Sequence, residues 1–151
     1  MDLPPALAWL VGRWAGEGEG EYPDCDDFRY RTELEFAHAR LDELVLAYSE
    51  HTWLLPDGAP SHEEAGYIRA TEHGRVELVV AHPIGVVEVH DGTATDRRID
   101  LESLTVAHTP TGSAVTSWST ADSRVRETMI WPGLASEHKR AARFETGPMA
   151  P

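Results

Sequence analysis

Histidine is the residue type in this chain best suited to chemistry, because its side chain titrates near neutral pH and ligates metals. The chain contains eight histidines. No two have the HExxH spacing that sets a pair on one helix face for zinc. His73 lies beside Gly74 in a turn, and His108 precedes a Thr-Pro-Thr-Gly segment, so both are predicted to face solvent. His82 precedes Pro83, which favours extended backbone, and we expect it to shape a bend between two strands.

The other residue types that can carry out chemistry give weaker evidence for a functional site than the histidines do. The single cysteine, Cys25, lies among aspartates that disfavour its thiolate, which argues against a nucleophile. One cysteine also excludes a disulfide framework and fits a reducing compartment. The chain has no GxSxG, P-loop or dinucleotide motif. Adjacent acids such as Glu63 and Glu64 lie on opposite faces of a strand, so we expect solvated charges there and no carboxylate dyad.

A glycine-rich segment near the N-terminus places Gly12, Trp14, Gly16 and Gly18 on one face of a strand. Glycines on one face let a bulky group approach the backbone, which would suit a flat ligand above Trp14. The same glycines would let a sharply coiled first strand bend, with Trp14 plugging the end of a barrel. Taken alone, the glycines favour bending.

Length and charge narrow the class of protein. The chain has 151 residues and a formal net charge of −13. That length predicts one domain, residues 1–151. The negative charge disfavours nucleic acid and anionic membrane surfaces as partners. The sequence holds no apolar run long enough for a membrane span and no basic leader segment, so we expect a cytoplasmic protein.

The elements that would position these residues are short strands. A helical turn is predicted near residues 4–11, because prolines suit the first turn of a helix and Gly12 can end it. Alternating runs broken by turn residues then follow, and Asp91-Gly92 gives the strongest hairpin signal. The pattern predicts an all-β fold, an antiparallel β-barrel of about ten strands with a frayed tail over about 145–151. The predicted strands cover 28–36, 41–55, 64–71, 76–80, 86–90, 99–107, 114–120 and 124–131, with 138–144 as a strand or short helix.

Four segments in order resemble the nitrobindin family of haem-binding barrels, which are similar in shape to fatty-acid-binding proteins. The first is the GRWAGEGEGEYP segment that contains Trp14. The second is HEEAGYIR, which begins at His62, and the third is VELVVAHPIGVVEV, which contains His82. The fourth is a methionine, Met129, followed by a loop and the HKRA segment that begins at His138. The resemblance spans about residues 8–142.

This resemblance implies one haem b per chain at the barrel mouth, with the imidazole of His138 as the axial iron ligand. It implies nitric oxide and peroxynitrite as small-molecule ligands, and isomerisation of peroxynitrite to nitrate as the activity. His62 is implied as a second pocket residue. We expect Arg29, Arg69 or Arg140 to offset the negative charge where an anion enters.

Alternatives remain open. Judged by residues alone, His138 lies in a charged segment typical of a protein surface. It follows Met129 by nine residues where the family spacing is ten, which would instead place Lys139 at the iron in an alignment without gaps. The hairpin over 115–129 is also shorter than in the family. A haem-free barrel that binds an apolar small molecule is therefore a second hypothesis, and a second copy of the chain is a further candidate partner.

Overall fold

The computed structural model describes residues 3–20, 28–40, 44–55, 57–95, 98–112, 126–130 and 145–148, with side chains omitted in 19–20, 126–130 and 145–148. Within these residues, a four-residue helix, α1, comes first and strands make up most of the rest. A 3₁₀ turn, η1, joins the fourth and fifth of the described strands. The elements are α1 (Pro5–Ala8), β1 (Gly12–Gly20), β2 (Phe28–His38), β3 (Val45–Leu55), β4 (Pro60–Ala70), η1 (Glu72–Gly74), β5 (Arg75–His82), β6 (Val86–Ala94), β7 (Arg98–His108), β8 (Arg126–Ile130) and β9 (Glu145–Pro148).

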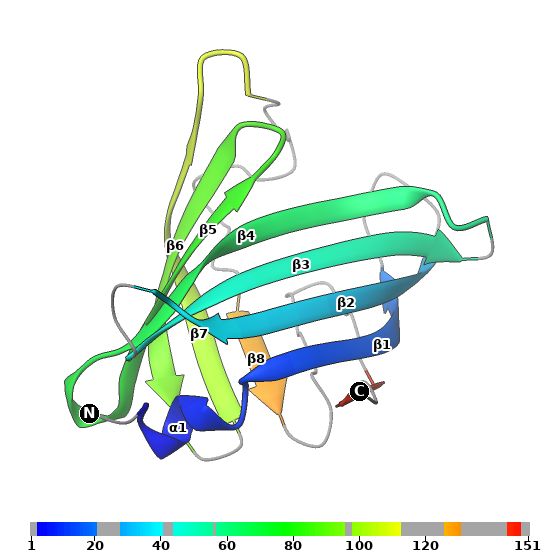
Figure 1. Cartoon of the computed structure of the whole chain (residues 1–151). Helices are drawn as coiled ribbons and strands as arrows, with labels where there is room; N and C mark the ends of the chain where they lie inside the picture. The colour runs from blue at the N-terminus through cyan, green and yellow to red at the C-terminus, as the bar shows by residue number, and fades with distance from the viewer. Residues whose placement is uncertain are drawn as a thin grey trace.

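The described strands form one antiparallel sheet in the order β8-β7-β6-β5-β4-β3-β2-β1-β9. From β1 to β8 every strand pairs with its neighbour in sequence, as in an up-and-down meander. The sheet curves strongly, so β7 and β8 lie across the interior from β1 and β2 (Figure 1). Trp14 of β1 and Leu34 of β2 share one hydrophobic cluster with Ile99 and Leu101 of β7. The predicted antiparallel all-β fold is therefore confirmed.

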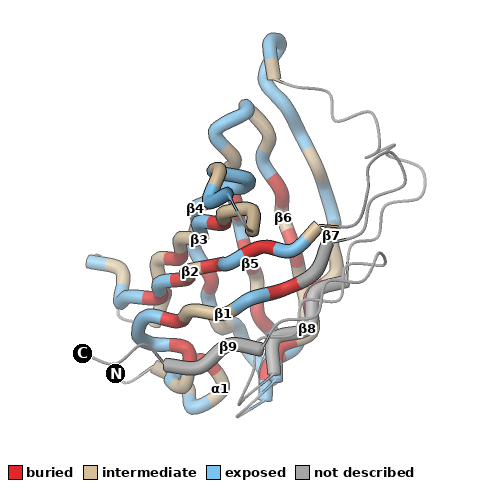
Figure 2. The backbone as a smooth tube through the Cα atoms, turned by 90° about the vertical axis from the view of Figure 1, so that its right-hand side faces the viewer, coloured by how far each residue is buried: buried red, intermediate tan, exposed pale blue. Residues whose placement is uncertain are grey.

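The interior is set by period-two alternation. In β2, residues 30, 32, 34 and 36 are buried while the residues between them are exposed or half-buried. β5 repeats the pattern at positions 76, 78 and 80. The buried positions appear as short red segments along β1 to β7 (Figure 2). One face of the sheet therefore packs inward and the other meets water, as expected of antiparallel pairing.

The two ends of the interior differ in chemistry. At the end where β1 begins and β4 ends, α1 packs against the sheet and buries Leu7 and Leu10 completely. The indole Nε1 of Trp14 donates a hydrogen bond to the Leu10 carbonyl oxygen at 2.8 Å, which fixes α1 to β1. Apolar side chains fill this end, and polar ones occupy the interior toward the opposite end. Within the described residues, no helix is long and apolar enough to cross a membrane.

Gly18 of β1 leaves space for a side chain of the neighbouring strand β2. A Cβ on Gly18 would collide with the ring of Tyr30, its partner on β2. The glycine therefore makes room for a neighbouring aromatic side chain of the protein. At this glycine the space is filled by the protein's own aromatic ring, and Trp14 is buried beside α1.

Three local expectations differ from the structure. Asp91-Gly92 was expected in a hairpin turn, yet both residues lie inside β6, and the reversal occurs where the Thr95 N–H bonds the Arg98 carbonyl oxygen at 2.7 Å. A Cβ at Gly92 would overlap the Asp100 carbonyl, so the glycine allows close approach of β7. β4 begins at Pro60, four residues before the predicted start. Residues Glu145–Pro148, placed by the sequence in a frayed tail, pair with β1 as β9.

Candidate functional site

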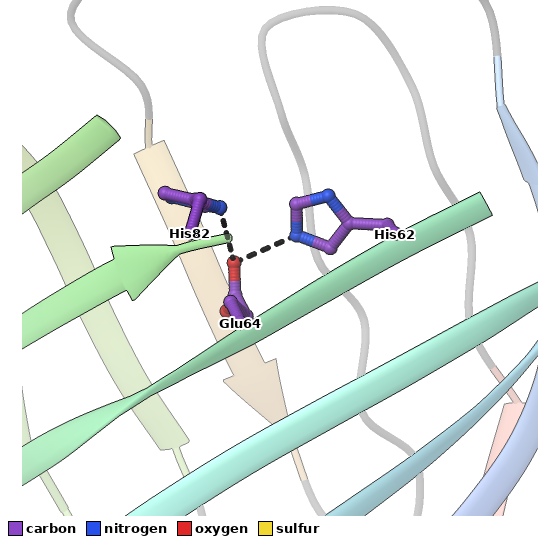
Figure 3. Close-up of side chains that lie close together, drawn as sticks. All are labelled: His62, Glu64 and His82. Atoms are coloured by element: carbon purple, nitrogen blue, oxygen red, sulfur yellow. Dashed lines mark hydrogen bonds and ion pairs between the residues drawn. The ribbon is translucent and has the colours of Figure 1, made fainter. Parts of the chain in front are cut away.

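A cluster of ionisable side chains lies inside the sheet at the end opposite α1. His62 and Glu64 come from the start of β4 and point to the same face, because they are two residues apart in a strand. His82 is the last residue of β5 and continues the inward-facing series 76, 78, 80. The three side chains converge in Figure 3. His62, Glu64 and His82 are called the central triad below.

The central triad is held together by the Glu64 carboxylate. His62 Nε2 lies 2.9 Å from Glu64 Oε2, a hydrogen-bond distance. His82 Nδ1 lies 3.7 Å from the same oxygen, an ion-pair distance. The two imidazole rings are 5.2 Å apart, centroid to centroid. About half of the His62 side chain is exposed (46%), whereas those of Glu64 (13%) and His82 (9%) are largely covered.

The Glu64 side chain is also held by Tyr48 of β3. The Tyr48 hydroxyl donates a hydrogen bond to Glu64 Oε1 at 2.5 Å. Burial by itself would raise the pKa of the Glu64 carboxyl, but hydrogen bonds from His62 and Tyr48 and the charges of both histidines outweigh it and lower that pKa. Glu64 is therefore the ionised partner of this group.

The pKa of Glu50 is shifted in the opposite direction. Its Oε1 accepts a hydrogen bond from the Thr32 hydroxyl at 2.6 Å, and its Oε2 lies 2.8 Å from the Tyr48 hydroxyl. Burial, followed by repulsion from Glu64, raises the pKa of the Glu50 carboxyl. The Tyr48 hydroxyl is within donating distance of both carboxyl groups, and because a phenol has one proton it donates to one of them at a time. Tyr48 therefore links Glu50 and Glu64.

His82 is held on its other side by a second buried carboxylate. Its Nε2 lies 3.0 Å from Glu88 Oε1, and His90 Nε2 lies 3.2 Å from Glu88 Oε2. Glu88 is 5% exposed and His90 2%. Burial opposes ionisation of Glu88, but hydrogen bonds from the two imidazoles and their charges lower its pKa to about 2. A carboxylate therefore fixes the ring orientation of His82 from β6.

A cavity of about 310 Å³ opens above the central triad. Its walls come from residues 51–53 of β3, 60–63 of β4 and 82–84 at the turn that leads to β6. His62 and His82 reach this cavity, whereas Glu64 is not among the residues that line it. Trp53, Pro60, Pro83 and Ile84 give it apolar surface. The cavity therefore combines apolar walls with two imidazoles, and a carboxylate lies behind them.

The rim of the cavity carries a second histidine–glutamate pair on the outer face of the sheet. His51 Nε2 lies 3.6 Å from Glu63 Oε1, and the His51 ring stacks on Trp53 at 6.2 Å between centroids. The Arg31 guanidinium lies 4.7 Å from the centroid of the Trp53 ring. Arg31 is thus a cation beside the entrance.

The structure places some of the candidate residues identified from the sequence, while others lie outside the described part of the chain. His62 lines the cavity, as expected of a pocket residue. His138 lies outside the described residues, as do Lys139 and Arg140, so the axial-ligand prediction is not tested by the geometry. Gly12, Trp14, Gly16 and Gly18 all belong to β1, and Trp14 is in the core at the far end.

The arginines that we expected to offset the negative charge at the mouth are not all found at that end of the barrel. Arg69 lies near the end of β4 and pairs with Glu77 at 2.6 Å, so it is far from the cavity. Arg29 begins β2 at the cavity end but pairs with Glu17 at 3.2 Å. Arg31, which the sequence analysis did not single out, lies closer to the cavity through its contact with Trp53.

Sequence reasoning also missed the roles of two of the three members of the central triad. Glu64 was expected as a solvated charge, yet its side chain faces inward while the adjacent Glu63 faces out, with side-chain exposures of 13% and 60%. His82 does shape the turn, since its carbonyl oxygen accepts from the Gly85 N–H at 3.0 Å, but its ring also enters the cluster. The signal was present in strand parity: both residues continue inward-facing series.

Comparison with known proteins agrees with this architecture. The family model of the THAP4-like, haem-binding β-barrel domain matches residues 5–142. A relative named peroxynitrite isomerase 2, from Mycobacterium marinum, is 40% identical over 156 residues, which covers 95% of this chain and 96% of that protein. Peroxynitrite isomerase 1 of Mycobacterium tuberculosis is 43% identical over 121 residues, 77% of this chain and 73% of that protein.

A solved structure gives the same result in three dimensions. The crystal structure of Rv2717c from M. tuberculosis aligns with a TM-score of 0.75 and 30% sequence identity, and the alignment covers 99% of this chain and 100% of that one. The family match spans most of the chain, and the sheet and its meander are those of a β-barrel. The chain belongs to the family of THAP4-like, haem-binding β-barrel domains.

Proposed function

We propose that this chain binds one haem b at the cavity end of the barrel through His138, binds nitric oxide, and isomerises peroxynitrite to nitrate. Two observations support the proposal. The chain belongs to a haem-binding family, and relatives about 40% identical are named peroxynitrite isomerases. The observation of this structure that carries it is the cavity with apolar walls and an inward-facing His62 at the barrel mouth.

The described residues fit a haem. A haem needs apolar walls for its faces and polar groups near the edge that meets water. The cavity supplies Trp53 and Ile84 as apolar surface, with the exposed outer pair of His51 and Glu63 at its rim. Arg31, held over Trp53, adds a cation at the rim that suits a carboxylate group.

Each residue has a distinct task in this proposal. The neutral imidazole of His138 would hold the iron. Ferric haem supplies a Lewis acid at which peroxynitrite rearranges. The chain itself contributes binding and orientation: Glu64 fixes the His62 ring at the cavity, and Trp53 and Ile84 give the cavity apolar surface. We further propose a cytoplasmic location and a homodimer as the assembly to test.

Haem binding is tested by titrating the full chain with haemin and recording the Soret band. We expect saturation at one haem per chain, and we expect the His138→Ala variant to lose the bound-state spectrum. Lys139→Ala is the matched control, because an alignment without gaps would point that lysine at the iron. Loss of the band in Lys139→Ala and its retention in His138→Ala would refute the assignment of the ligand.

Activity is tested on the haem-loaded chain by following peroxynitrite decay in stopped flow and quantifying nitrate. The expected result is faster decay with nitrate as the main product, and no acceleration by the haem-free chain. Equal decay with and without haem would refute the isomerase assignment, while Soret binding alone would still support a haem carrier.

A haem-free barrel that carries an apolar molecule was the other hypothesis. In the described part of the chain, the interior beyond the core is occupied by Glu50, Glu64, Glu88 and His90. A hydrocarbon chain placed there would leave buried carboxylates in contact with apolar groups, which costs free energy. The geometry therefore favours the haem proposal.

A further inference from the structure

The central triad has the composition of a transition-metal site. Two imidazoles and one carboxylate are a common set of protein ligands for zinc, and sites with three protein ligands leave one position open. One ligand atom from each of His62, Glu64 and His82 lies within 4.8 Å of the other two. Among the described residues, this is the one group of histidines, cysteines and acids that meets such a criterion.

The distances between donor atoms are close to those of an occupied site. In a tetrahedral zinc centre with bonds of about 2.0–2.2 Å, neighbouring donor atoms lie about 3.3–3.5 Å apart. Glu64 Oε2 lies 2.9 Å from His62 Nε2 and 3.7 Å from His82 Nδ1. Shifts of a few tenths of an ångström would bring both pairs to the required spacing, and His62 is exposed enough to move.

A supporting shell of hydrogen bonds is already in place. A metal-bound histidine usually donates a hydrogen bond from its second ring nitrogen to a carboxylate or carbonyl oxygen, which fixes the ring orientation and the tautomer. His82 has this arrangement, since Nδ1 faces Glu64 while Nε2 contacts Glu88 Oε1 at 3.0 Å. The Glu64 carboxylate is fixed likewise, with Tyr48 bonded to Oε1 and Oε2 directed to the imidazoles.

The site also has an entry path. His62 and His82 line the 310 Å³ cavity, and Glu64 lies behind them. An ion that approached through the cavity would meet both imidazoles and then the carboxylate, and its fourth position would face the cavity. A buried carboxylate beside two imidazoles favours a borderline ion such as Zn²⁺ over Ca²⁺ or Mg²⁺, which prefer oxygen ligands.

We propose that His62, Glu64 and His82 form a binding site for one divalent transition-metal ion, of which Zn²⁺ is the representative, at the inner wall of the mouth cavity. The site is separate from the proposed iron ligand His138 and does not require haem. It adds a second metal to a chain whose family is described by its haem alone.

The outer pair of His51 and Glu63 provides a matched control. Its imidazole is 48% exposed in the side chain, close to the 46% of His62, and it too faces a glutamate, at 3.6 Å. The pair lies on the outer face and lacks a second histidine. His51→Gln and His62→Gln therefore remove equally exposed imidazoles, and only the second removes a ligand of the proposed site.

The first test measures Zn²⁺ affinity by competition with a chromophoric chelator, with the full chain freed of metal and haem. We expect one ion per chain. Loss of a ligand in His62→Gln should weaken affinity by more than about 100-fold, and Glu88→Gln, which alters the partner of His82, by about 10-fold. His51→Gln should bind as the wild type does. Equal affinity of wild type and His62→Gln, or equal losses in both histidine variants, would overturn the proposal.

The second test uses Co²⁺ and thermal unfolding. Co²⁺ bound in a site of low coordination number gives strong visible d–d absorption, which we expect for the wild type and not for His62→Gln. Because an ion that binds only the folded chain stabilises it, Zn²⁺ should raise the Tm of the wild type and leave that of His62→Gln unchanged. Equal shifts in both proteins would place the ion elsewhere and overturn the proposal.

His138→Ala separates this proposal from the haem proposal. We expect the variant to lose the Soret band of bound haem while its Zn²⁺ affinity stays at the wild-type value. Loss of Zn²⁺ binding in this variant would overturn the metal site. Wild-type chain that binds Zn²⁺ but takes up no haem would instead refute only the proposed function.

Discussion

At the scale of single residues, the cavity end of the barrel depends on an ordered set of charges. Hydrogen bonds from imidazoles help to lower the pKa values of Glu64 and Glu88, while burial and repulsion from Glu64 raise the pKa of Glu50. Tyr48 links Glu50 to Glu64. Buried polar groups are stable only when each has a partner, so this set of bonds fixes the side-chain orientations at the site.

The raised pKa of Glu50 predicts the effect of an amide in its place. A raised pKa means that Glu50 favours the folded state at low pH, and that this contribution is lost as the pH rises through the raised pKa. Glu50→Gln keeps both hydrogen bonds and does not titrate. We expect the variant to gain free energy of unfolding relative to the wild type as the pH rises toward neutrality, measured by urea unfolding. A loss of stability of Glu50→Gln relative to the wild type that grows as the pH rises toward 7 would contradict the raised pKa of Glu50.

Glu88 predicts the opposite pH dependence. Its folded pKa of about 2 lies below the ordinary value of 4.5, so its contribution is present above about 4.5 and lost as the pH falls toward 2. The shift corresponds to at most about 3 kcal/mol of free energy of unfolding. We expect the stability gap between wild type and Glu88→Gln to narrow as the pH falls from about 4.5 toward 2, in urea unfolding with a chelator present. A gap independent of pH would contradict this assignment.

At the scale of elements, the site depends on how β4 and β5 pair. Their register sets Gly66 opposite Val80, and it places the triad residues of β4 beside the end of β5. A Cβ at Gly66 would overlap the Val79 carbonyl oxygen, so the two strands approach more closely than a side chain permits. The glycine thereby helps to coil the sheet and to bring His82 toward Glu64.

Gly66→Ala should therefore destabilise the barrel by about 2 kcal/mol or more, because the added methyl group forces the two strands apart. Gly58→Asn is the control, since Gly58 has a positive φ of 73° that asparagine tolerates, and a Cβ there meets nothing within 4 Å. Urea unfolding of both variants gives the comparison. Similar stabilities would show that β4 and β5 can separate at this point without loss.

At the scale of the whole molecule, the chain is divided into an apolar end closed by α1 and a polar end open at the cavity. The net charge of −13 repels an incoming anion. Arg31 beside Trp53 offsets this charge only locally. The entrance therefore suits a neutral ligand better than an anion at low ionic strength.

This charge predicts how salt affects the proposed reaction. Added salt screens repulsion between the protein and anionic peroxynitrite, so the bimolecular rate constant of the haem-loaded chain should rise by a factor of about 2–10 from low to physiological ionic strength. Binding of nitric oxide, which is neutral, is the control and should change little. Stopped-flow measurement of both rates tests this, and a fall in the peroxynitrite rate with salt would mean that the entrance is locally positive.

Much of the architecture could be predicted from the sequence, and the departures have physical causes. Strand alternation identified the sheet, and Pro4 and Pro5 marked the start of α1. The prediction of a hairpin turn at Asp91-Gly92 was wrong, because glycine occurs both in turns and where two strands approach closely. Only the position of β7 distinguishes the two cases. The prediction for His138 stays a prediction, since the residue lies outside the described part of the chain.

The sequence by itself determined the antiparallel β-fold and the net negative charge, because alternation and composition can be read along the chain without knowing which strands meet. Only the tertiary structure decided that Glu64, His82 and Glu88, from three different strands, meet His62 and its neighbours inside the sheet. Strand parity tells which residues share a face, but the coiling and register of the sheet determine which of them come within bonding distance.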